Sequence, residues 1–93
     1  MILVPIWLNT ENVIEFFDSS FNQIGPFVLA LKNDKICSNY KITIDSFTIC
    51  KGVVKFSFIL DCSIPVGEYS AEIIDSSNLA VLMRFKAGLY GVK

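Results

Sequence analysis

The side chains of this sequence that could act as nucleophiles or metal ligands are few and widely spaced. Cys37, Cys50 and Cys62 are 13 and 12 residues apart, form no C-x-x-C pair, and have no histidine to work with. Histidine is the commonest general base and a principal zinc ligand, so a catalytic or zinc site has little to be built from. A zinc site of three cysteines is the disfavoured alternative. We expect free thiols, buried as small hydrophobic side chains in a reducing compartment.

Five aspartates are spaced almost evenly, each at or near an expected turn or strand end: Asp18, Asp34, Asp45, Asp61 and Asp75. Gathered at one end of a sandwich, they could bind calcium. The sequence contains no D-x-D or D-x-N-x-D loop, and an aspartate in a turn commonly accepts hydrogen bonds from nearby backbone. Turn chemistry therefore explains them better than a metal does.

No motif of an enzyme accompanies these residues. The chain lacks a G-x-S-x-G nucleophile elbow and a glycine-rich phosphate loop. A nucleophile also needs a base beside it, and none is evident. We therefore expect no catalytic residue, no metal site and no cofactor.

The composition favours a protein that meets other proteins. The 93 residues suit a single domain, 1–93, and 53% of them are hydrophobic while 18% are charged, with a net charge of −1. This excludes disorder, and the basic surface of a nucleic-acid binder is absent. No apolar stretch approaches a membrane span, and residues 1–8 lack the basic start of a secretory signal. The surplus of apolar residues favours an assembled subunit, in contact with other proteins or as a homo-oligomer, over a monomer with an apolar surface.

The elements that must carry these side chains are β-strands, because apolar and polar residues alternate with period two. The alternation is clearest over 40–45, 53–60, 68–75 and 79–86, with Lys51-Gly52 as a hairpin turn. Residues 47–50 could continue the strand 40–45 past a bulge near Ser46. Ala87-Gly88 is expected to end the strand 79–86, leaving 89–93 as a short last strand or tail.

The first half alternates less regularly. Residues 2–8 predict a strand at a sheet edge, because Pro5 cannot donate to a ladder. Residues 13–17 predict a strand before a turn into 21–24, with a short helix capped by Thr10 as the alternative. Gly25-Pro26 predicts a turn and 27–31 a strand.

Seven or eight short strands with frequent turns predict an all-β protein, a small antiparallel β-sandwich, with a small barrel as the other solution. The residues expected in its core are apolar and share the inner faces of these strands: Ile42, Ile44, Phe56, Phe58, Tyr69, Ile73, Val81 and Met83.

The C-terminal part resembles small virion proteins of tailed bacteriophages, especially crAss-like phages. The resemblance lies in the P-x-G-E-Y turn and strand at 65–69, the aspartate hairpin after it, and the closing segment Gly88-Leu89-Tyr90-Gly91-Val92. Residues 27–33 resemble the strand ending in asparagine that opens that domain, so the resemblance covers 27–93. The chain departs from the pattern at Ser76-Ser77-Asn78, where a glycine is usual, and at Ala71, where an aromatic residue often stands.

This resemblance implies an immunoglobulin-like β-sandwich without enzymatic activity, carried in the virion after assembly in the host cytoplasm. It would be an auxiliary capsid protein, a head-fibre base or another minor head component. Its partners would be the major capsid protein or other virion subunits, with no nucleic acid or membrane. The alternative is an immunoglobulin-like binding module or small inhibitor that recognises a host protein or glycan.

The N-terminal strand is the candidate subunit interface, because it is apolar on both faces and must be covered on both. Its residues are Ile2, Leu3, Val4, Ile6 and Trp7, and the tail residues Leu89, Tyr90 and Val92 would add a second contact. Trp7 would anchor the contact. The alternative places residues 1–8 in the sheet of their own domain. Pro65, Gly67 and Gly88 are expected to shape turns.

Overall fold

A computed structural model describes residues 3–91, and all of its regular structure in that range is β-strand. The eight strands follow one another along the chain: β1 (Val4–Trp7), β2 (Glu11–Phe17), β3 (Phe27–Asn33), β4 (Ser38–Thr43), β5 (Ser46–Cys50), β6 (Val53–Ile59), β7 (Gly67–Asp75) and β8 (Ala80–Tyr90). Over the described residues there is accordingly no helix that could cross a membrane. The predicted all-β fold is confirmed.

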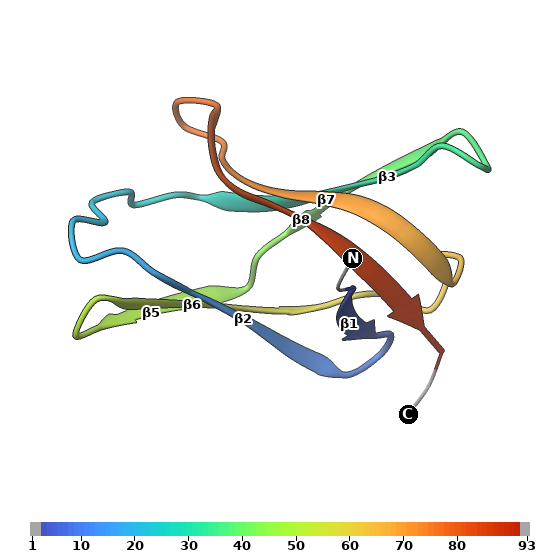
Figure 1. The fold of residues 1–93 in the computed structure, drawn as a ribbon, viewed down its shortest axis with the longest axis horizontal. Helices are drawn as coiled ribbons and strands as arrows, with labels where there is room; N and C mark the ends of the chain where they lie inside the picture. Colours follow the sequence, from blue (N-terminus) through green and yellow to red (C-terminus); the bar gives the residue numbers. More distant parts are fainter. Residues whose placement is uncertain (1–2, 92–93) are drawn as a thin grey trace.

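The strands form two sheets packed face to face, as the two layers of Figure 1 show. One sheet has five strands in the order β1-β8-β7-β3-β4, and the other has three in the order β2-β6-β5. Between these strands every pairing is antiparallel except that of β1 with β8, which is parallel, and an isolated parallel bridge joins Leu8 to Leu60. This is a β-sandwich with β1 at one edge, where Pro5 predicted it.

The strand order is that of an immunoglobulin-like fold. Strands β2, β6 and β5 correspond to B, E and D of that fold, and β3, β7 and β8 to C, F and G, with β4 as the added strand C′. A tyrosine corner accompanies the topology, because the hydroxyl of Tyr69 on β7 donates to the carbonyl of Pro65 at 2.7 Å. Antibody domains link B and F by a disulfide, whereas here neither β2 nor β7 carries a cysteine.

The core lies between the two sheets and is built from alternate residues of their strands. Phe56, Phe58 and Ile73 are fully buried there, while Tyr69 and Ile44 are nearly so. Phenylalanine rings gather at one end of this core, with the centroids of Phe27 and Phe47 4.7 Å apart. These contacts replace the disulfide as the link between the layers.

Three predicted core residues differ from expectation. Ile42 and Met83 are only half-buried, and Val81 is 41% exposed. The pairing of β7 with β8 shifts register at Ile73/Ile74, which places Val81 opposite Ile74. This bulge inserts one residue into β8, so the alternation read from the sequence changes face there.

The strand boundaries also required two corrections. Residues 40–50 are not one bulged strand, since β4 and β5 belong to different sheets and the chain crosses between them at Ile44 and Asp45. Ala87 and Gly88 do not interrupt β8, which runs on to Tyr90 because β1 and β7 flank it on both sides. Both errors arise because a sequence pattern shows alternation but not which strand is the neighbour.

The other expectations for the first half have mixed outcomes. Residues 13–17 lie in β2, so the strand is confirmed over the short helix. Residues 21–24 belong to no strand, but Phe21 packs against the core from the loop 18–26. The hairpin at Lys51-Gly52 is confirmed, and both residues have positive φ (52° and 79°), as a tight two-residue turn requires.

Candidate functional site

The aspartates are dispersed over the domain, and most of those expected in turns are there. Asp18, Asp61 and Asp75 each accept a hydrogen bond from the backbone N–H two residues ahead, at 2.8–3.0 Å. Within residues 3–91, no three acidic, cysteine or histidine side chains come together in a way that could hold a metal ion. These three aspartates therefore stabilise turns.

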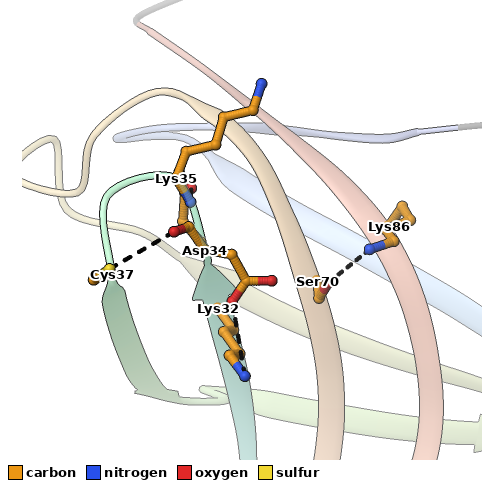
Figure 2. A network of polar contacts seen from close by, with 7 residues as sticks. Lys32, Asp34, Lys35, Cys37, Ser70 and Lys86 are labelled. Atoms are coloured by element: carbon orange, nitrogen blue, oxygen red, sulfur yellow. Dashed lines mark hydrogen bonds and ion pairs between the residues drawn. The ribbon is translucent and has the colours of Figure 1, made fainter.

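The cysteines are free, but the prediction that they are buried is wrong, because Cys37, Cys50 and Cys62 are all exposed. Cys37 lies in the turn between β3 and β4, where its thiol is 3.8 Å from the carbonyl oxygen of Asp34 (Figure 2). Cys50 ends β5, and Cys62 lies between β6 and β7. Turns and the end of an edge strand do not face the core, which explains this exposure.

Part of the candidate interface does come together. Trp7 and Tyr90 are cross-strand partners in the β1–β8 pair, and their ring centroids are 5.1 Å apart at 37°. Leu3 and Val66 lie beside Tyr90 around a hollow of about 380 Å³. We call Leu3, Trp7, Val66 and Tyr90 the terminal surface. Val66 is 59% and Tyr90 42% exposed, and both line the same hollow.

Glycines open this hollow. Gly67, Gly88 and Gly91 line it and contribute no side chains. The ring of Tyr90 lies across Gly88, since a Cβ there would be 3.0 Å from the tyrosine hydroxyl. Pro65 lies in the segment before β7, and Gly67, with φ 140°, is the first residue of that strand. Gly88 instead lies inside β8, so its role is to admit the ring and not to turn the chain.

The remaining interface candidates lie elsewhere. Ile6 and Leu89 are almost completely buried in the core of their own domain, so their side chains are not available to a neighbouring subunit. Val4 is half-buried in β1. Ile2 and Val92 lie outside the described residues.

An asparagine that the sequence did not bring to attention fixes Trp7 in place. The side-chain oxygen of Asn12 accepts from the backbone N–H of Trp7, and its amide donates to the Trp7 carbonyl, both at 2.9 Å. Asn12 is almost fully buried and bonds in addition to Thr10. The side chain of Asn12 on β2 therefore bonds to the backbone of β1 much as a neighbouring strand would. A lone asparagine in an alternating strand gives no sequence signal for such a role.

A broad groove crosses the outer face of the five-stranded sheet, with a volume of about 750 Å³. Small residues, Ala30 and Ser70, form part of its floor, and long side chains from β3, β4 and β8 surround them. Figure 2 shows Lys86 reaching over Ser70, whose hydroxyl lies 2.7 Å from the ammonium nitrogen.

The charges of this groove largely pair with one another. Lys32 lies 3.7 Å from Asp34, and Arg84 lies 2.6 Å from Glu72. These pairs are solvent-exposed and contribute little to stability. The groove is therefore a mixed polar surface without the concentrated charge of a phosphate or nucleic-acid site.

The far end of the sandwich carries a third surface, made by loop 18–26 and turn 76–79. Asn78 donates to the side chain of Gln23 at 3.0 Å, which joins the two segments. Ile24 and Leu79, each next in sequence to one of these residues, are 83% and 78% exposed. Leu79 has φ 59°, a backbone conformation that bulky side chains rarely adopt.

Comparison with known proteins identifies no relative of this chain. No family model, no curated protein and no solved structure matches the chain.

Proposed function

We propose that this protein is a structural subunit that acts by binding other proteins and performs no reaction of its own. Following the resemblance in its C-terminal part, we place it in the particle of a tailed bacteriophage as an auxiliary capsid or head protein. The observation that carries the proposal is the terminal surface, where exposed Val66 and Tyr90 lie together with half-buried Leu3 and Trp7.

The arrangement suits a contact between proteins. Tryptophan and tyrosine are enriched among residues that dominate interface energetics, and they lose little side-chain entropy on binding. Here Asn12 and the β1–β8 pairing hold Trp7 in position before any partner arrives. A preorganised aromatic pair lowers the cost of binding.

The experiment is a comparison of Tyr90→Ala with Ile49→Ala, assayed for incorporation into particles. Both substitutions remove an exposed apolar side chain, but Ile49 lies in β5 and does not belong to the terminal surface. We expect at least a tenfold loss of incorporation for Tyr90→Ala, equivalent to about 1.4 kcal/mol or more, and little for Ile49→Ala. Equal incorporation of both variants would refute the role of the terminal surface.

A second function has its own supporting observation, the exposed Ile24 and Leu79 at the joined loops. An immunoglobulin-like module that recognises a host protein or glycan would use such loops, and their serine, asparagine and glutamine content suits adaptable contacts. Binding of host-cell extract components that is lost in Leu79→Gly but kept in Tyr90→Ala would favour this function over assembly. Leu79→Gly also relieves the positive φ, so it is not expected to impair folding.

A further inference from the structure

We propose that copies of this chain join head to tail by pairing the exposed edge of β2 in one copy with the exposed edge of β4 in the next. This contact is separate from the terminal surface and does not depend on the proposed role in a virion. It follows from which backbone groups and which charges the two edges present.

Strand β2 is an edge of the three-stranded sheet, with β6 as its neighbour. The N–H of Asp18 donates to the carbonyl of Gly52 at 2.8 Å, in line with the register of the β2–β6 pair. In an antiparallel ladder, bonded pairs recur every second residue. Val13, Glu15 and Phe17 therefore direct their N–H and C=O groups away from β6, toward solvent.

Strand β4 is an edge of the five-stranded sheet and has the same arrangement. Its register with β3 includes the bond from the N–H of Ile44 to the carbonyl of Phe27, at 2.9 Å. Asn39, Lys41 and Thr43 consequently direct their backbone groups outward. Each edge thus offers three residues with free donors and acceptors, and a charged residue stands at the centre of each.

The central charges select the partner. Glu15 and Lys41 are both exposed, and neither forms an ion pair with another described residue. Two β2 strands that match Val13 with Phe17 of a second copy would set the two Glu15 carboxylates opposite each other. Two β4 strands that match Asn39 with Thr43 of a second copy would oppose their lysines in the same way. Like charges directly opposite are unfavourable, whereas β2 against β4 opposes Glu15 to Lys41.

The antiparallel register that pairs Glu15 with Lys41 of a second copy also matches the other side chains. On the outer face it sets Val13 against Thr43, two β-branched residues. On the inner face it sets Phe16 against Tyr40, both half-buried in the single domain. Aromatic and β-branched cross-strand pairs are among the favourable ones. Glu15 already lies opposite Lys55 of β6, so β4 of the second copy would place a lysine on each side of this glutamate.

The two edges differ, so the contact is heterologous. Each copy that uses its β2 still has a free β4, and the association can continue into chains. The sheet formed at each junction would run β5-β6-β2 of one copy into β4-β3-β7-β8-β1 of the next.

The test is charge exchange, measured by sedimentation of the full chain over a range of concentrations. We expect the wild-type protein to self-associate and Glu15→Lys and Lys41→Glu each to weaken association about tenfold, since an attractive cross-strand pair becomes repulsive. The double variant Glu15→Lys/Lys41→Glu, or an equal mixture of the two single variants, should restore it. A wild-type protein that stays monomeric at millimolar concentration, or single variants that associate as it does, would overturn the proposal.

A backbone variant provides an independent readout. Val13→Pro removes an N–H that points away from β6, so the fold should be retained while one intermolecular hydrogen bond is lost. Its circular dichroism should match that of the wild type, and its association should be weaker. Unchanged association of folded Val13→Pro would contradict pairing through the β2 edge.

Discussion

The hydroxyl of Tyr69 lies 2.7 Å from the carbonyl oxygen of Pro65, four residues earlier in the chain. This bond ties the turn before β7 to the strand itself, at the point where the chain passes from one sheet to the other. The tyrosine ring is at the same time one of the largest fully buried side chains of the core. One residue therefore fixes both the turn that borders the terminal surface and the packing beneath it.

Tyr69→Phe should destabilise the protein by about 1–2 kcal/mol, because it leaves the Pro65 carbonyl without its partner while preserving the ring. The substitution should also change the alkaline limb of stability. Burial raises the pKa of Tyr69, while a hydrogen bond from Asn33 partly opposes that rise. Its neutral form stabilises the fold fully below the unfolded pKa of about 10, and that stabilisation is lost as the pH rises through the folded pKa.

Urea unfolding of the wild type and Tyr69→Phe at neutral and strongly alkaline pH measures both effects. The two proteins should differ less at alkaline pH than at pH 7. A constant difference would show that Tyr69 does not titrate as its burial requires.

Asp75→Asn should make the protein less stable at neutral pH and less sensitive to acid. The hydroxyl of Ser77 is the main group that lowers the pKa of Asp75, and the N–H groups of Ser77 and Gly25 assist it. A carboxylate with a lowered pKa stabilises the fold above its unfolded pKa of about 3.9, and this is lost as the pH falls through the folded value. Thermal unfolding between pH 2 and 7 checks this, and an equally steep acid limb in Asp75→Asn would contradict it.

Ile73→Ala and Val81→Ala form a matched pair on either side of the bulge. Ile73 is completely buried, so its truncation should cost about 2–5 kcal/mol. Val81 is 41% exposed, and its truncation should cost less than about 1 kcal/mol. Chemical denaturation of both variants gives the comparison. A large loss of stability for Val81→Ala would show that Val81 is buried, as the uninterrupted alternation of the sequence predicts.

All three cysteines should react with a thiol reagent in the native protein, because all three are exposed. The native protein should therefore give the same count of reactive thiols as the protein unfolded in guanidinium. Serine substitution of each should change stability by no more than about 0.5 kcal/mol. A thiol that reacts only after unfolding would show that one cysteine is buried after all.

The period-two pattern was sufficient to predict the strands and the sandwich, because a strand with one buried and one exposed face alternates apolar and polar residues. It could not reveal the bulge opposite Ile74 or the passage between sheets at Ile44 and Asp45, which depend on the neighbouring strand. Burial of the cysteines was predicted from their residue type alone, whereas their positions in turns and at the end of β5 leave them exposed.

The terminal surface was predictable only in part, for a related reason. Apolar residues on both faces of β1 indicated that both faces are covered, and this is so for Ile6, which the core of its own domain covers. Trp7 and Tyr90 remain at the surface, held by Asn12 and by a glycine that admits the ring. An asparagine on another strand and a glycine without a side chain hold these rings, and a period-two pattern does not reveal such contacts.

The proposed role in a virion is tested by the copy number of this protein in purified particles of the phage that would encode it, determined by quantitative mass spectrometry. We expect many copies per particle for the wild type and at least tenfold fewer when Tyr90→Ala replaces it, with the variant folded and expressed at the same level. A protein that is abundant in infected cells and absent from the purified particles would contradict the account.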